Sequence, residues 1–204
     1  GLGTRLLPLS SLIPKELLPI NGKPNLEYIM EECIQAGIKQ FIFVVPKNRP
    51  IIKNYFFNDK FYKKILKKKK KDKRIKDIFK RLKRYQKMIK FVYQNKPEGT
   101  GHAIMQCEKF LKGSHFLMLL ADDLIVKKNC SKEMIVLHRK TKGSVIATKK
   151  VDRKTVSRWG ILGFKNKKKN SFLINEVIEK PKLSEAPSNY AIIGRYILPK
   201  KIIS

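Results

Sequence analysis

Three short apolar runs constrain most strongly what this chain can fold into. They lie at 41–45, 116–121 and 144–148, and each is five or six residues long. A continuous apolar run of this length is typical of a strand buried on both faces of a parallel sheet. The segment 26–37 places its apolar side chains on one face of a helix and ends at Gly37, a residue typical of helix C-termini. Strands that alternate with helices indicate βαβ units and therefore an α/β fold.

The first nineteen residues combine a glycine turn with two cations. Gly1 and Gly3, followed by Thr4, let backbone N–H groups approach phosphate oxygens without a side chain in between. Arg5 and Lys15 supply charge-assisted hydrogen bonds where negative charge concentrates. This pattern predicts a site for a nucleoside triphosphate and chemistry at a phosphate. The alternative for both cations is ordinary surface charge, since the chain has 47 basic residues.

Further motifs follow in order along the whole chain. The chain begins with G-L-G-T-R-L-L-P at 1–8 and I-P-K-E-L-L-P at 13–19. The motifs that follow are Gln94, G-T-G-H-A-I at 99–104, L-A-D-D at 120–123, W-G at 159–160, E-K-P at 179–181, A-P-S-N at 186–189 and I-G-R-Y at 193–196. The set resembles the bacterial sugar-1-phosphate nucleotidyltransferases. The I-P-K-E form is that of their UTP:glucose-1-phosphate uridylyltransferase (UDP-glucose pyrophosphorylase) branch. The resemblance implies a Rossmann-like mixed, mostly parallel sheet flanked by helices, of the nucleotide-diphospho-sugar transferase type.

The resemblance also implies a reaction: UTP and glucose 1-phosphate give UDP-glucose and pyrophosphate, with Mg²⁺. In such a transfer the protein mainly positions the reactants and neutralises charge. Gly1, Gly3, Thr4 and Arg5 are then the triphosphate loop, with Arg5 on the β/γ side and Lys15 near the α-phosphate. Two alternatives stay open within the family, namely transfer of another nucleotide such as thymidylate, and an inactive paralogue. Thymidylyltransferases usually carry S-K-x-L-x-P, so the P-K-E-L-L-P of this chain argues against the first.

Asp122 is the expected Mg²⁺ ligand, because a hard cation that bridges phosphates prefers a rigidly held carboxylate oxygen. Neighbouring side chains on an extended segment point in opposite directions, so Asp123 is expected to reach the metal less well. The alternative for Asp123 is a cap on the following turn. Gln94, at the end of a predicted strand over 89–93, offers a donor and an acceptor to uracil, and Gly99 lets the base lie against the backbone.

The nucleotide motif departs from the family at two positions. Glu98 and Thr100 stand where the family usually has a basic and an aliphatic residue, which leaves the base preference open. His102, which follows the second glycine of this motif, is interpreted as a structural residue near the start of a helix rather than as an acid or base.

Glu179 and Lys180 resemble the family's sugar-phosphate pair, in which the carboxylate accepts from sugar hydroxyls and the ammonium contacts the phosphate. Gly160 would allow close backbone approach to the hexose, and Asn189 is a further candidate hydroxyl ligand. The alternative for the charged pair is a surface turn before Pro181. For Asn189 the alternative is a loop asparagine that satisfies its own backbone.

Much of the net charge of +31 lies in residues 60–90, where 17 Lys or Arg face 2 Asp. One interpretation is a patch for nucleic acid or an anionic membrane. The interpretation that we favour is a lysine-rich helical insertion, with one apolar stripe against the core and its cations in water. That stripe consists of Ile75, Ile78, Phe79, Leu82 and Tyr85. We therefore expect neither a specific nucleic-acid partner nor a membrane partner.

The three cysteines have unrelated spacings, which excludes a recognisable zinc site or disulfide framework and fits a reducing cytoplasm. Neither a long apolar span nor a leader is visible in the sequence. We expect one nucleotidyltransferase domain over 1–204, in a fragment that lacks the first strand and the C-terminal part. The full-length protein is expected to form a homo-oligomer.

Overall fold

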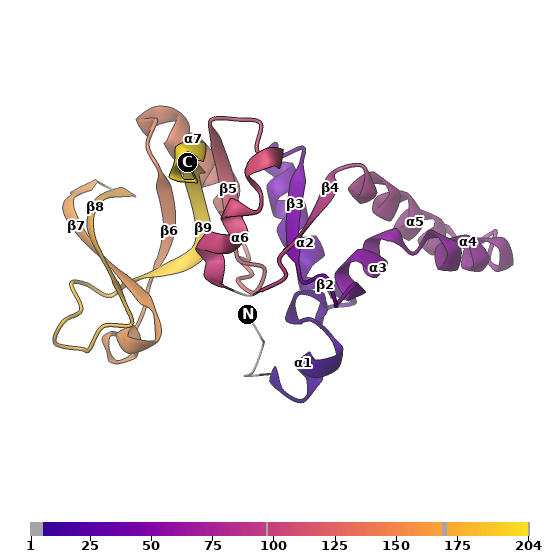
Figure 1. The fold of residues 1–204 in the computed structure, drawn as a ribbon, viewed down its shortest axis with the longest axis horizontal. Coiled ribbons are helices and arrows are strands. Elements are labelled where there is room, and N and C mark those ends of the chain that lie inside the picture. The colour runs from indigo at the N-terminus through magenta and orange to yellow at the C-terminus, as the bar shows by residue number, and fades with distance from the viewer. Residues whose placement is uncertain (1–5, 97, 169–170, 204) are drawn as a thin grey trace. The chain divides into compact units, whose positions relative to one another are not determined.

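A computed structural model describes residues 6–96, 98–168 and 171–203. The chain divides into two compact units, which Figure 1 shows with their elements labelled. The first unit contains the chain up to Ser114 together with the segment that starts at Lys200, and the second is His115–Pro199. The expectation of a single domain stays a prediction.

A parallel strand pair lies in the first unit. β3 (Phe41–Val45) runs beside β4 (Ile89–Tyr93), with Phe41 opposite Ile89 and Val45 opposite Tyr93. Both strands lie where the apolar patterns predicted them. α2 (Asn25–Gln35) precedes β3 and buries four apolar side chains, Leu26, Ile29, Met30 and Cys33.

The end of α2 explains the abrupt passage into β3. Gly37 has a φ of +92°, and its N–H donates to the Ile34 carbonyl, while the Ile38 N–H donates to the Cys33 carbonyl. This pair of hydrogen bonds is the Schellman arrangement, which needs a left-handed residue and so favours glycine. The predicted helix end at Gly37 is confirmed.

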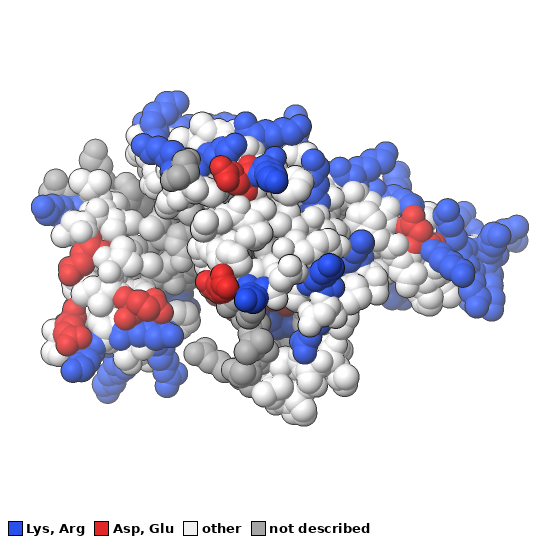
Figure 2. Space-filling model, in the orientation of Figure 1, with Lys and Arg blue, Asp and Glu red and all other residues white. Residues whose placement is uncertain are grey.

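Three helices connect β3 to β4: α3 (Ile51–Phe57), α4 (Asp59–Lys68) and α5 (Lys73–Gln86). Asp72 caps α5 by accepting from the Ile75 N–H. Leu82 and Tyr85 are buried, and the other three members of the predicted stripe are half-buried. The lysine-rich segment is thus helical, with its apolar stripe packed and Lys and Arg spread over its exposed surface (Figure 2).

Short elements complete the first unit. They are α1 (Leu9–Leu12), η2 (Lys15–Leu17), β1 (Pro19–Ile20), β2 (Lys23–Pro24), α6 (Gly99–Met105), η3 (Glu108–Phe110) and η5 (Lys200–Ile202). β1 and β2 form an antiparallel hairpin.

The second unit is built around β9 (Tyr190–Pro199). β5 (His115–Leu119) and β6 (Val145–Lys150) each pair antiparallel with β9. β7 (Gly160–Lys168) pairs antiparallel with β8 (Ser171–Glu179), and it meets β9 where Ile161 lies opposite Ala191. α7 (Cys130–Thr141) packs against β6 and β9 over a core that includes Met134 and Ile197. η4 (Arg153–Arg158) lies between β6 and β7.

The pairing of β5 and β6 corrects one expectation. Their apolar runs were predicted to have parallel neighbours, yet the described neighbour of both is the antiparallel β9. A continuous apolar run reports burial, and burial does not depend on the direction of the adjacent strand. Among the described strand pairs, the one between β3 and β4 is parallel and the others are antiparallel.

Candidate active site

The glycine turn of the predicted triphosphate loop, with Gly1, Gly3, Thr4 and Arg5, lies outside the described residues. Lys15 is the member of this group that the structure places. It opens η2 and is half-buried, and its carbonyl accepts from the Leu18 N–H at 3.2 Å.

Lys15 is held close to a tight hairpin. Asn21 and Gly22 connect β1 to β2 with φ values of +49° and +75°, which fits the Asn-Gly turns that join two antiparallel strands. The Asn25 N–H donates to the Leu18 carbonyl at 3.1 Å, so the returning strand leads directly into α2. The backbone that carries Lys15 is therefore fixed to the start of a buried helix.

Gln94 follows β4 directly, at the carboxyl end of the parallel pair, where α/β sheets usually bind ligands. Its N–H donates to the Val45 carbonyl at 3.1 Å. Its side-chain Nε2 lies 3.3 Å from the Gly99 carbonyl and 3.1 Å from His102 Nδ1. The structure thus brings together Gln94 and Gly99, the two residues predicted to hold the base.

Gly99 opens α6 with a φ of +93°, a backbone that side chains rarely allow. His102 lies one turn further along α6, between the amides of Gln94 and Gln106. These contacts agree with the structural role predicted for His102. A cavity of about 330 Å³ lies here, lined by Tyr93, Asn95, Lys96, Glu98, His102 and Gln106. Glu98 therefore puts a carboxylate beside the predicted base site.

The two aspartates after β5 have different environments. Asp123 is half-buried, and its Oδ2 accepts from the Gly194 N–H at 2.7 Å. The carboxylate thus binds the backbone of β9. Its observed partner is therefore not the following turn, which was the alternative interpretation of Asp123. Asp122 is exposed. Asp122 as the metal ligand stays a prediction.

Arg195 holds the same segment from within the second unit. Its side chain is fully buried, and its guanidinium donates to the carbonyls of Leu120, Asp123 and Gly194 at 3.3, 2.8 and 3.1 Å. A buried guanidinium with several carbonyl acceptors restricts the backbone it binds. No role for Arg195 was predicted from the sequence, although an arginine inside an apolar strand pattern is a signal that could have revealed one.

Gly194 makes this arrangement possible. A Cβ there would lie 2.5 Å from Leu120 Cβ and 2.7 Å from Asp123 Oδ2, closer than real contacts allow. Tyr196, two residues further along β9, has a raised pKa because it is buried and because Asp123 and Glu179 add negative charge. Its hydroxyl therefore stays protonated at neutral pH.

The predicted sugar-phosphate residues Gly160, Glu179 and Lys180 come together where β7 and β8 pair. Gly160 lies opposite Glu179, and the Lys180 N–H donates to the Trp159 carbonyl at 2.9 Å. Lys180 Nζ lies 3.6 Å from Glu179 Oε1, with both side chains exposed. The pair thus presents a donor and an acceptor to solvent next to a residue without a side chain.

Asn189 has a backbone contact. Its Nδ2 donates to the Val151 carbonyl at 3.1 Å, and the Val151 N–H donates to the Asn189 carbonyl at 2.9 Å. The Nδ2 group of Asn189 is thus bound within the protein, by Val151 rather than by its own backbone. The role of Asn189 in binding hydroxyls stays a prediction.

Within the described ranges, no group of three or more His, Cys, Asp or Glu could hold a metal on its own. Proteins usually hold Mg²⁺ through one or two carboxylates, with waters and the substrate's phosphates completing the coordination. Asp122, an exposed carboxylate on a restrained segment, fits that requirement. No helix in the same ranges is both long and apolar enough to cross a membrane.

Comparisons with known proteins agree with this geometry. The family model of the nucleotidyl transferases matches residues 1–204, so the chain belongs to that family. It is 38% identical to a UTP–glucose-1-phosphate uridylyltransferase of Staphylococcus saprophyticus, over 99% of this chain and 70% of the relative. The structure of an apo UDP-glucose pyrophosphorylase matches with a TM-score of 0.86 and 32% identity, covering 100% of this chain and 75% of that one. The structure of a UDP-glucose pyrophosphorylase complexed with UDP-glucose matches with a TM-score of 0.81 and 33% identity, covering 100% of this chain and 74% of that one. The resemblance and the mixed α/β fold class are thereby confirmed. The expected predominance of parallel pairing does not hold among the described strands, where β3 and β4 form the one parallel pair.

Proposed function

We propose that this protein transfers a uridylyl group from UTP to glucose 1-phosphate. A phosphate oxygen of glucose 1-phosphate attacks the α-phosphorus of UTP. The bond from that phosphorus to the α–β bridging oxygen breaks, and pyrophosphate leaves with the electron pair. The observation that carries the proposal is the 38% identity to a uridylyltransferase over nearly the whole chain.

The first unit supplies the proposed nucleotide site. Gly1, Gly3, Thr4 and Arg5 form the triphosphate loop, and Arg5 neutralises the departing pyrophosphate. Lys15 approaches the α-phosphate from the start of η2. Gln94 and Gly99 bind the uracil, and they already contact one another. Binding of the base requires the Gln94 amide to exchange its Gly99 or His102 contact for the ligand.

The second unit supplies the proposed sugar-phosphate site and the metal ligand. Lys180 contacts the phosphate of glucose 1-phosphate, Glu179 and Asn189 accept from its hydroxyls, and Gly160 allows the hexose to approach the backbone. Asp122 is the residue that would hold Mg²⁺, and the bound ion neutralises negative charge on the phosphates. Asp123 and Arg195 hold the backbone on either side of Asp122.

The proposal extends to the state of the protein in the cell. The intact protein is a homo-oligomer in the cytoplasm, and it binds neither a specific nucleic acid nor a membrane. The unrelated spacings of the three cysteines support a reducing compartment. Burial raises the pKa of the Cys107 thiol, which keeps it protonated and unreactive.

Pyrophosphate release by the intact protein, measured for every pairing of UTP, dTTP, ATP, GTP and CTP with several sugar 1-phosphates, tests the proposal. The expected result is that UTP with glucose 1-phosphate has the highest kcat/KM. Chelation of Mg²⁺ is expected to abolish this turnover. A preference for dTTP would replace uridylyl by thymidylyl transfer. Absence of turnover with every pair would indicate an inactive paralogue.

A further inference from the structure

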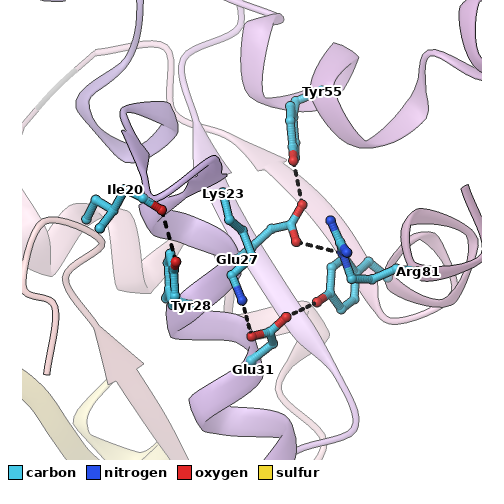
Figure 3. A network of polar contacts seen from close by, with 8 residues as sticks. Ile20, Lys23, Glu27, Tyr28, Glu31, Tyr55 and Arg81 are labelled. Carbon is cyan, nitrogen blue, oxygen red and sulfur yellow. Dashed lines mark hydrogen bonds and ion pairs between the residues drawn. The ribbon is translucent and has the colours of Figure 1, made fainter. Parts of the chain in front are cut away.

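A fully buried carboxylate links α2 to the lysine-rich segment. The side chain of Glu27, on α2, has no exposed surface. It accepts a hydrogen bond from the Tyr55 hydroxyl on α3, and its Oε2 lies 2.9 Å from Arg81 Nε on α5 (Figure 3). Burying a carboxylate without a partner is strongly unfavourable, so α2 and α5 are constrained to stay in contact at this point.

A second carboxylate, one turn further along α2, makes a parallel link. Glu31 accepts from the Tyr85 hydroxyl of α5 at 3.1 Å and forms an ion pair with Lys23 of β2 (Figure 3). Tyr85 is itself buried, and its ring packs against Phe56 at 6.2 Å between centroids. Glu31 therefore connects α5 to the hairpin that follows Lys15.

The hairpin is fixed to α2 on its other strand as well. The Tyr28 hydroxyl donates to the Ile20 carbonyl of β1 at 2.9 Å, and the Lys23 ammonium lies 4.0 Å from the centre of the Tyr28 ring. Together with the Asn25 to Leu18 backbone hydrogen bond, these contacts hold both strands of the hairpin against α2. An unbroken series of contacts thus runs from Arg81 to the backbone next to Lys15.

We propose that Arg81 and Tyr85 are positioning residues for Lys15, acting through Glu27 and Glu31. The role of Lys15 in binding UTP rests on the proposed function, whereas the coupling of α5 to the hairpin does not. The same helix would then have two distinct surfaces. Lys73, Lys76 and Lys80 face water, and Arg81 and Tyr85 keep the substrate loop in place.

Burial and charge explain why this link is rigid. Burial and the adjacent Glu27 raise the pKa of Tyr55 far above its ordinary value, so its hydroxyl remains a donor at any physiological pH. Burial and the carboxylates of Glu31 and Glu27 also raise the pKa of Tyr85. Both tyrosine hydroxyls therefore keep their protons and remain donors to Glu27 and Glu31.

The test replaces Arg81 in the intact protein. Arg81→Met is expected to raise KM for UTP about ten-fold, the usual size of a coupling between packed elements, with KM for glucose 1-phosphate within about two-fold of its original value. Arg84→Met is the matched control, because Arg84 is exposed on the same helix and should leave both constants unchanged. If Arg81→Met lowers only the melting temperature and otherwise matches the control, the proposal is wrong.

Two further variants keep the test decisive. Glu27→Gln combined with Arg81→Met removes the uncompensated buried charge and should return KM for UTP to within about three-fold. A double variant no better than Arg81→Met would overturn an action through Glu27. Tyr85→Phe keeps the ring and loses one hydrogen bond, so it folds even if Arg81→Met does not, and it should raise KM for UTP about two- to three-fold.

Hydrogen exchange separates this proposal from the proposed function. In Arg81→Met and Tyr85→Phe, the backbone amides of residues 17–25 are expected to exchange faster than in Arg84→Met. Unchanged exchange would refute the coupling even in an active enzyme. If the protein transfers no nucleotide at all, faster exchange would still establish the coupling, and the assignment of UTP to Lys15 would be the part that failed.

Discussion

Replacing Gly194 by alanine tests whether the segment around Asp122 is held as tightly as the geometry indicates. A Cβ at Gly194 would lie 2.5 Å from Leu120 Cβ and 2.8 Å from Leu120 Cγ. Ordinary van der Waals contact begins at 3.4 Å, so the two backbones must separate by about 0.9 Å. Leu120 Cβ is attached directly to its backbone, which means that rotation of a side chain cannot relieve the clash.

The expected cost follows from this displacement. Overpacking of a well-packed site costs about 1–3 kcal/mol. The Gly194 N–H to Asp123 hydrogen bond, at 2.7 Å, would be weakened at the same time, and a hydrogen bond to a charged group contributes about 1.5–3 kcal/mol. Together these predict that Gly194→Ala lowers the free energy of unfolding by about 2–5 kcal/mol. Turnover should fall too, because Asp122 lies between Leu120 and Asp123, the two residues that the added Cβ would displace.

Urea unfolding and pyrophosphate release measure the two effects. Gly143→Ala is the control: its Cβ would meet Thr141 atoms only at 3.9 and 4.0 Å, and Gly143 is not in the left-handed region. It should change the free energy of unfolding by no more than about 0.5 kcal/mol. If both variants unfold at the same urea concentration and retain the same turnover, our reasoning about the contact between Leu120 and β9 is refuted.

Three further outcomes are expected in the intact protein. Asp122→Asn should lower turnover roughly a hundred-fold in a protein that still folds. Asp123→Asn should cost about 1 kcal/mol of stability and less turnover. The opposite ranking of turnover in a pyrophosphate-release assay would reverse the choice of metal ligand. Lys180→Ala should raise KM for glucose 1-phosphate about ten- to hundred-fold and KM for UTP less, and equal effects would remove Lys180 from the sugar-phosphate site. Changing residues 67–71 from Lys to Gln should leave turnover within a few-fold, with weak, salt-sensitive binding of DNA or RNA before the change; tight, sequence-selective binding that disappears with the run would support a nucleic-acid partner instead.

The elements of the fold could be predicted where a local pattern determines them. The strands at 41–45 and 89–93, the helix that ends at Gly37 and the packed stripe of α5 all follow from periodicity and end signals. The direction of strand neighbours could not be predicted, because the partner of β5 lies much later in the chain and apolar runs contain no information about orientation.

In the candidate site too, local motifs could be predicted and tertiary contacts could not. Motif residues such as Gln94 with Gly99, and Glu179 with Lys180, do come together as predicted. The contacts that hold the segment around Asp122 were not predictable: an arginine in an apolar strand can be noticed, but the backbone carbonyls that Arg195 binds leave no mark in a sequence. Glu27 and Arg81 meet only through tertiary packing, and nothing in the spacing of two charged residues indicates that they pair.

The central position of β9 has a consequence for the order in which the second unit folds. β5 and β6 leave the ribosome first, yet both wait for β9 before their described backbone hydrogen bonds can form. The β7–β8 hairpin is local and can form early. Pairings between distant segments form slowly and leave strand edges exposed meanwhile. The emergence of β9 is therefore the step at which β5 and β6 gain their described backbone partner.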